Sequence, residues 1–271
     1  MSFVQFRPAP PLRDSIATIW DWRVEPGEFR LERILPSPGA GLIVNLFEDE
    51  TRVYADDATR RCERTEGCAL NGQALRSFLI DTREQIAVMG VIFRPGGAAH
   101  FLREPMQRLA DTHASLSALG LTGVGALRER LLNTLDATAR IALLEGWLRE
   151  RYRPDAVHPA IAWALRTLEA SPCVARVDGL VAASGYSARR FGELFQQQVG
   201  AGAKAYARLL RFRATIDAME RGRRIEWSRI AADCGFHDQP HLVREFRAFA
   251  GMTPGEYALR RGPDVNHVAL T

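Results

Sequence analysis

The sequence predicts an α+β fold: a β-rich N-terminal domain of jelly-roll or barrel-like type with flanking helices, followed by an all-α C-terminal domain. Up to about residue 97, short apolar runs are separated by turn residues, whereas helical spacing dominates the rest of the chain. A helix-turn-helix pattern also occurs twice, about fifty residues apart, with a long helix between the copies. At 271 residues two domains are expected, and we place them at residues 1–153 and 154–271.

Four runs in the N-terminal part have the character of β-strands. In the first, residues 16–24, Trp20, Trp22 and Val24 occupy one face and Asp21 and Arg23 the other. Three denser apolar runs follow, at residues 41–47, 77–80 and 86–93. Short strands separated by turns indicate an antiparallel sandwich or barrel.

The aromatic residues on these strands have two interpretations. They can line an apolar pocket for a small-molecule effector, or they can be ordinary core residues. The candidate pocket residues are Trp20, Trp22, Phe47, Phe78 and Phe93.

Helical spacing begins beyond Gly97. Leu127, Leu131 and Leu135 recur in steps of four, and a second helix is expected over residues 138–153. The apolar stripe of that second helix can pack within the chain or against a second copy in a homodimer. The run Arg153-Pro154-Asp155 ends the helix and marks the domain boundary.

Residues 227–249 read as two short helices around a tight turn. Gly235 stands where the chain reverses, and glycine adopts the required positive φ without a steric penalty. Asp238 occupies an N-cap position, and Pro240 is tolerated in the first turn of the second helix. Leu242 and Phe246 form the buried stripe of this helix, which leaves a polar outer face suited to a DNA major groove.

The same unit occurs upstream, around Gly185. Phe195, Gly200 and Tyr206 are spaced 5 and 6 residues apart, and Phe246, Gly251 and Tyr257 repeat that spacing. Between the units, residues 204–221 follow helical spacing and would form a helix of about 27 Å. Two units joined in this way would reach major grooves one turn of DNA apart.

The second unit resembles the C-terminal signature of the AraC-type (AraC/XylS) transcriptional regulators. The resemblance covers roughly residues 158–261 and implies a helical domain that presents two helix-turn-helix units to DNA. The first unit departs from the pattern, because residues 200–203 lack the Thr253-Pro254 pair of the second unit and Val181 replaces a small residue. The matching positions are Ile230, Ala231, Gly235, Phe236, Asp238, Gln239, Pro240, His241, Leu242, Arg244, Phe246, Gly251, Met252, Thr253, Pro254 and Tyr257.

The residues expected to contact DNA lie at the start or on the outer face of the second helix of each unit. In the first unit they are Ser187, Arg189, Arg190, Glu193 and Gln197. In the second unit they are Asp238, Gln239, His241 and Arg244. Residues 158–271 carry a net charge of +5 and residues 1–157 one of −1, so the basic surplus lies where phosphate contacts are expected.

Other function classes have little support in the sequence. No apolar run approaches the ~18 residues of a membrane span. The N-terminus lacks secretory features, and four scattered cysteines fit a reducing compartment, so we expect a cytoplasmic protein. We interpret Cys62 and Cys68 as idle residues of an exposed loop between strands, with an oxidant-sensing thiol as the alternative.

The sequence has no zinc-ligand spacing, phosphate loop or catalytic serine motif. We therefore expect that the protein binds no metal or cofactor and is not an enzyme. The alternative is an enzyme or DNA-repair-type protein with an N-terminal pocket, although only two cysteines lie in that half. The sequence therefore predicts a DNA-binding transcription factor, with a small-molecule effector, RNA polymerase and a second copy as further partners.

Overall fold

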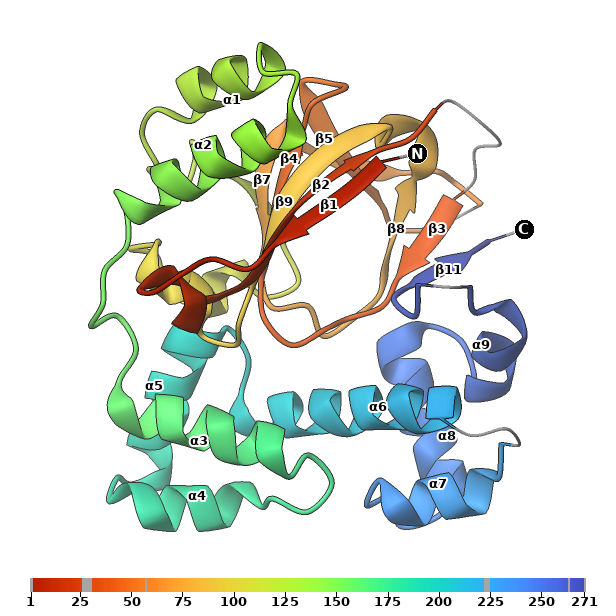
Figure 1. Ribbon diagram of the computed structural model, residues 1–271. Helices are drawn as coiled ribbons and strands as arrows, with labels where there is room; N and C mark the ends of the chain where they lie inside the picture. Colours follow the sequence, from red (N-terminus) through yellow and green to blue (C-terminus); the bar gives the residue numbers. More distant parts are fainter. Residues whose placement is uncertain (1, 26–30, 57, 222–224, 263, 271) are drawn as a thin grey trace.

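The computed structural model describes residues 2–25, 31–56, 58–221, 225–262 and 264–270. The N-terminal part contains two facing β-sheets, with two helices packed on the outer side of one sheet (Figure 1). The remaining helices lie below the sheets in two groups, which are joined by a long horizontal helix. No helix among the described residues is long and apolar enough to cross a membrane.

The two sheets are antiparallel and stay separate within the described residues, so the expected two-sheet architecture is confirmed but a closed barrel is not formed. The first sheet has the strand order β1 (Ser2–Phe6), β2 (Ile16–Arg23), β9 (Ala87–Phe93), β4 (Gly41–Asn45), β7 (Cys68–Asn71), β10 (His113–Ser115). The second has the order β11 (His267–Ala269), β3 (Leu31–Ile34), β8 (Phe78–Asp81), β5 (Glu50–Tyr54), β6 (Cys62–Glu66).

The four strands expected from apolar patterning are present as β2, β4, β8 and β9. The sequence pattern missed strands such as β5 and β6, because their partly exposed faces carry charged residues that pair with each other, as Arg64 does with Glu50. The interpretation of Cys62 and Cys68 as loop residues is wrong. Cys62 lies in β6 and Cys68 in β7, where it is buried.

The charged face of β2 is the one that the helices cover. Asp21 forms a two-point ion pair with Arg140 of α2 (Ala137–Arg149), at 2.6 Å (Oδ2 to Nε) and 2.8 Å (Oδ1 to Nη2). Both side chains are only 1% exposed. Arg140 Nη1 also donates to the carbonyl oxygens of Thr134 and Leu135, so every part of the guanidinium has a partner.

Two helices cover this face of the first sheet, α1 (Val124–Leu132) and α2. The apolar stripe of α2, including Ile141, Leu144 and Leu148, is buried in the same core as the sheet. That stripe therefore packs within the chain and is not available to a second copy. Two details differ from expectation, because α2 ends at Arg149, and Leu135 is 92% exposed in the turn between the helices.

The C-terminal helices form two small cores on either side of α6 (Ala203–Arg221). Leu210 of α6 packs in the first core, and Leu209, Phe212 and Ile216 pack in the second. The first core includes α3 (Pro159–Ala170), α4 (Val177–Ser184) and α5 (Ala188–Val199). The second includes α7 (Trp227–Asp233), α8 (Gln239–Ala250) and α9 (Pro254–Arg260).

The C-terminal part is not all-α, because β11 leaves it and pairs with β3 at the edge of the second sheet. Val268 is fully buried there, and His267 Nδ1 lies 2.8 Å from Glu32 Oε2. A strand of three residues gives no periodic signal, and its partner lies more than two hundred positions away. The described residues also form the 3-10 helices η1 (Leu12–Asp14), η2 (Thr82–Glu84), η3 (Gly97–His100) and η4 (Met106–Leu109).

The buried ion pair leads to a stability prediction. The variant Asp21→Ala leaves the buried charge of Arg140 without its carboxylate partner. We therefore expect the free energy of unfolding to fall by about 3–5 kcal/mol. Urea denaturation at neutral pH measures this loss. The control is Glu104→Ala, which removes an exposed ion pair with Arg108 and should cost less than about 1 kcal/mol. Equal losses in the two variants would contradict the prediction.

Candidate nucleic-acid interface and ligand cavity

The turn of the second helical pair depends on Gly235. Its φ is +72°, and an added Cβ would lie 2.5 Å from the carbonyl oxygen of Cys173. Any side chain here would thus be both strained and sterically blocked. The next helix, α8, begins after Asp238, whose Oδ1 accepts from the amide of His241 at 2.7 Å. These backbone contacts lower the pKa of Asp238, because they stabilise its ionised carboxylate.

The outer face of α8 presents Gln239 and Arg244, both exposed. His241 is half-buried, and its Nδ1 accepts from the amide of His237 at 3.3 Å, while its ring packs edge-on against Phe236. Glu245 of the same helix pairs with Arg208 of α6. Arg247 in the last turn is exposed as well, so polar side chains run along the outer face of α8, and those near its start can reach the base edges of DNA.

The first helical pair has the same construction. Gly185 at φ +72° ends α4, and Ser187 Oγ accepts from the amide of Arg190 at 3.2 Å, which caps α5. On the outer face of α5, Glu193 pairs with Arg189 at 3.0 Å and lies 3.7 Å from Arg190. Gln197 is exposed one turn further along the helix. The predicted residues thus gather in two groups, one on α5 and one on α8.

The two groups are held apart by α6. This helix has 19 residues and is therefore about 28 Å long. Tyr206 and Phe212 of α6 are almost fully buried, one in each core, so each pair is packed onto its own end of the helix. The arrangement can present two polar helix faces at a fixed separation.

The five candidate pocket aromatics do not line one cavity. Phe93 is buried in the core against Phe101, and Phe47 is 52% exposed just beyond β4. Trp20 and Trp22 lie on the face of β2 opposite Asp21, where Trp22 packs edge-on against Phe3. Among the five, only Phe78 contributes to the cavity described next.

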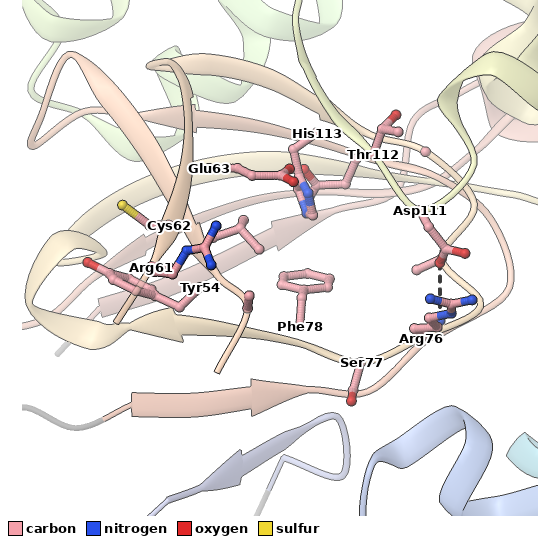
Figure 2. A pocket seen from close by; sticks show the side chains of 15 residues that line it. Tyr54, Arg61, Cys62, Glu63, Arg76, Ser77, Phe78, Asp111, Thr112 and His113 are labelled. Atoms are coloured by element: carbon pink, nitrogen blue, oxygen red, sulfur yellow. Dashed lines mark hydrogen bonds between the residues drawn. The ribbon is translucent and has the colours of Figure 1, made fainter. Parts of the chain in front are cut away.

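A cavity of about 550 Å³ lies where strands of the two sheets approach each other. In Figure 2, Phe78 of β8 lies centrally, His113 and the end of Glu63 lie above it in the view, and Arg61 and Arg76 lie to its left and right. The rings of Phe78 and His113 meet edge to face at 4.7 Å. Sequence reasoning missed this site, because β6, β7 and β10 are too short or too polar to be recognised.

Two polar atoms in the cavity-lining residues lack a hydrogen-bond partner within the described part of the chain. They are Oδ1 of Asn71 and Nε2 of His113, both buried. Burial also lowers the pKa of His113 to about 4, despite the opposing effect of nearby Asp111. The ring is therefore neutral near pH 7. Unsatisfied buried groups of this kind cost about 1–3 kcal/mol each.

Two families match parts of the sequence. Residues 4–115 match a domain of unknown function (DUF6597), and residues 180–260 match a helix-turn-helix domain. None of the curated proteins matches the chain.

Several solved structures are similar to the chain. One structure of ToxT from Vibrio cholerae has 10% sequence identity over 96% of this chain and 98% of its own, with a TM-score of 0.47. An AraC-type regulator from Chromobacterium violaceum has 24% identity over 39% of this chain and 94% of its own, with a TM-score of 0.36. The xylose-binding activator XylR has 17% identity over 45% of this chain and 37% of its own, with a TM-score of 0.34.

The helix-turn-helix match covers both helical pairs and α6, and it defines a DNA-binding protein. The two pairs share landmarks at fixed offsets, and the second carries the AraC-type signature from Ile230 to Tyr257. Residues 180–260 belong to a helix-turn-helix family, and their signature resembles that of the AraC-type transcriptional regulators.

The environment of His113 predicts a dependence of stability on pH. Because its folded-state pKa lies below the ordinary value of about 6.5, the unfolded chain takes up the proton first as the pH falls. The stabilisation by the neutral ring is thus present at pH 7 and is lost between about pH 6.5 and pH 4. Between pH 7 and pH 5 we expect a loss of about 2 kcal/mol from this group. Urea denaturation should show a smaller loss in His113→Phe, and equal losses in both proteins would contradict the assignment.

Proposed function

We propose that the chain binds double-stranded DNA in a sequence-specific manner, with α5 and α8 in major grooves one turn apart. The main support is that both helices expose a capped, polar N-terminal face and are fixed to opposite ends of α6. A helix of about 28 Å, with the offset of each flanking helix, is compatible with the ~34 Å between successive major grooves.

The side chains of α8 have distinct roles in this proposal. Gln239 and Arg244 are free to reach base edges, and Arg244 can alternatively bind a phosphate. Asp238 caps the helix and positions it, because its carboxylate already accepts from the backbone. His241 contributes through the exposed part of its ring.

On α5, Arg189 and Arg190 are the principal candidates for DNA contact, together with Gln197. Glu193 pairs with Arg189 in the free protein, and it can either release the arginine to a phosphate or accept from a cytosine amino group. Ser187 caps the helix and can add a phosphate contact through its amide and hydroxyl groups.

The N-terminal domain, residues 1–153, would bind a small-molecule effector in this proposal and make DNA binding respond to it. The cavity beside Phe78 supports this role, because its lining combines an apolar ring with polar and charged side chains such as Arg61 and Arg76. Contacts with RNA polymerase and with a second copy of the chain are also consistent with a transcription regulator.

Alanine substitutions of Gln239 and Arg244 on α8 distinguish contacts to bases from contacts to phosphates. Gln239→Ala should cost about 1–3 kcal/mol at a single base pair and relax specificity there. If Arg244 binds a phosphate, Arg244→Ala should weaken binding to all sequences alike and lower the salt slope by about 1. Titrations of selected DNA at several salt concentrations distinguish the two roles. The matched control is Arg260→Ala, an exposed arginine of α9, and unchanged affinity and salt slope in both α8 variants would refute the groove assignment.

The rigid spacing of the helices predicts how binding depends on the DNA site. Protection should extend over two half-sites about one helical turn apart on the same face, and these need not be palindromic. Inserting about five base pairs places the half-sites on opposite faces and should sharply reduce affinity. A full-turn insertion should not restore binding, because α6 cannot lengthen. Footprints that tolerate these insertions would show that the two pairs are flexibly tethered.

A further inference from the structure

Residues 72–78, which we call the bridge segment, run between the cavity and both helical pairs. On one side they form part of the cavity wall, where Gly72, Ala74, Arg76, Ser77 and Phe78 are lining residues. The carboxylate of Asp111, another lining residue, accepts from the amides of Leu75 at 2.6 Å and Arg76 at 3.1 Å. The cavity wall and the backbone of the bridge segment are thus one hydrogen-bonded structure.

The first helical pair rests on the N-terminal end of the bridge segment. Gly200 ends α5 at φ +93°, and a Cβ added there would lie 3.2 Å from Cβ of Gln73 and 3.0 Å from the carbonyl oxygen of Met106. Gln73 itself is fully buried, and its side chain bonds to the amide of Gly39 and the carbonyl oxygen of Ser37. The end of α5 is therefore seated on a rigid part of the N-terminal domain.

The second pair rests on the other end of the same segment. The amide of Ser77 donates to the carbonyl oxygen of Phe249 at 2.9 Å, and its hydroxyl donates to that of Ala250 at 3.1 Å. Both acceptors belong to the last turn of α8. Gly251 follows at φ +68°, and a Cβ added there would lie 2.6 Å from Nη1 of Arg33.

Leu75 lies between these two attachment points. It packs against the core of the first helical pair and also against that of the second. The bridge segment therefore contacts both helical pairs, with Gln73 and Ser77 only four positions apart. A displacement of this segment would change how α5 and α8 lie relative to each other.

We propose that the cavity beside Phe78 is the effector site, and that the bridge segment transmits its occupancy to α5 and α8. This inference rests on the proposed function, since it specifies how DNA binding is regulated. A bound molecule that displaces Phe78 acts on the residue next to Ser77. One that bonds to Asp111 competes with the amides of Leu75 and Arg76 for its carboxylate. Because both helices must fit two grooves at once, a small change in their relative position alters affinity.

The cavity wall indicates the chemical class of the ligand. Phe78 offers an apolar ring, and Arg61, Arg76 and Glu63 add charged groups to the lining. The site therefore suits a small molecule that combines an apolar ring with polar or charged groups.

A tethered occupant tests the coupling without knowledge of the natural ligand. Glu63 is exposed and lines the cavity, so Glu63→Cys places a thiol there. The background is Cys62→Ser with Cys173→Ser, and Cys68 and Cys234 remain because they are buried and burial raises the pKa of each to about 11. N-phenylmaleimide then adds a planar ring with two carbonyl groups to the cavity.

DNA affinity is measured by fluorescence anisotropy on a selected duplex with both half-sites. Labelling should change the Kd at least about fivefold, within the usual range of allosteric coupling. The change should fall to about twofold or less when Leu75→Ala and Ser77→Ala are combined with Glu63→Cys, as expected for coupled residues in a mutant cycle. Labelling of Ala118→Cys, an exposed position outside the cavity lining, should leave the Kd unchanged.

The outcomes distinguish this inference from the proposed function. If the unlabelled protein binds no DNA sequence selectively, the proposed function fails. If it binds DNA but labelling at Glu63→Cys has no effect on the Kd, or the effect persists in the variant with Leu75→Ala and Ser77→Ala, the coupling inference is overturned.

Thermal unfolding of each variant checks its folding. Ser77→Ala alone serves as the milder variant, and labelling should then have a reduced effect on the Kd. If labelling at Glu63→Cys destabilises the fold, Arg61→Cys gives a second attachment point at the same cavity.

Discussion

The structure depends on the seating of two helix ends against one short segment of the N-terminal domain. Gly200 and Gly251 end α5 and α8 with positive φ angles, and neither has room for a Cβ without displacing a neighbour. Glycine satisfies both constraints, because it lacks the Cβ that would be strained and would clash. As a result, both helical pairs pack directly against the N-terminal part, one beside Gln73 and the other beside Ser77.

Ion pairs on α5 and α8 decide which charged side chains are free on the surface that would face DNA. On α8, Glu245 is held by Arg208 of α6, so this carboxylate faces α6 and not the outer face of the helix. On α5, Glu193 remains beside Arg189 on the exposed face, where a surface ion pair is worth little and is readily exchanged. The two helices therefore differ in how much of their positive charge is free before DNA arrives.

The N-terminal domain uses its buried charges in another way. The Asp21–Arg140 pair fixes α2 to one face of the first sheet, where the apolar stripe of the helix closes the core. Buried pairs of this kind add little to net stability, because desolvation offsets most of their attraction, but the loss of one partner is costly. With that face covered, the cavity forms on the side where the two sheets meet.

Local patterns determined much of the C-terminal half. The capping residues Ser187 and Asp238, the turn glycines and the helical spacing of α6 act within a few positions of each other, so they are readable in the sequence. The apolar strands β2, β4, β8 and β9 were predictable for the same reason. The separate sheets, the burial of Asp21, the pairing of β11 with β3 and the cavity around Phe78 were decided only by tertiary structure. Each of these joins residues far apart in the chain through contacts that leave no periodic signal, and an aspartate on a strand reads as exposed until a distant arginine is packed beside it.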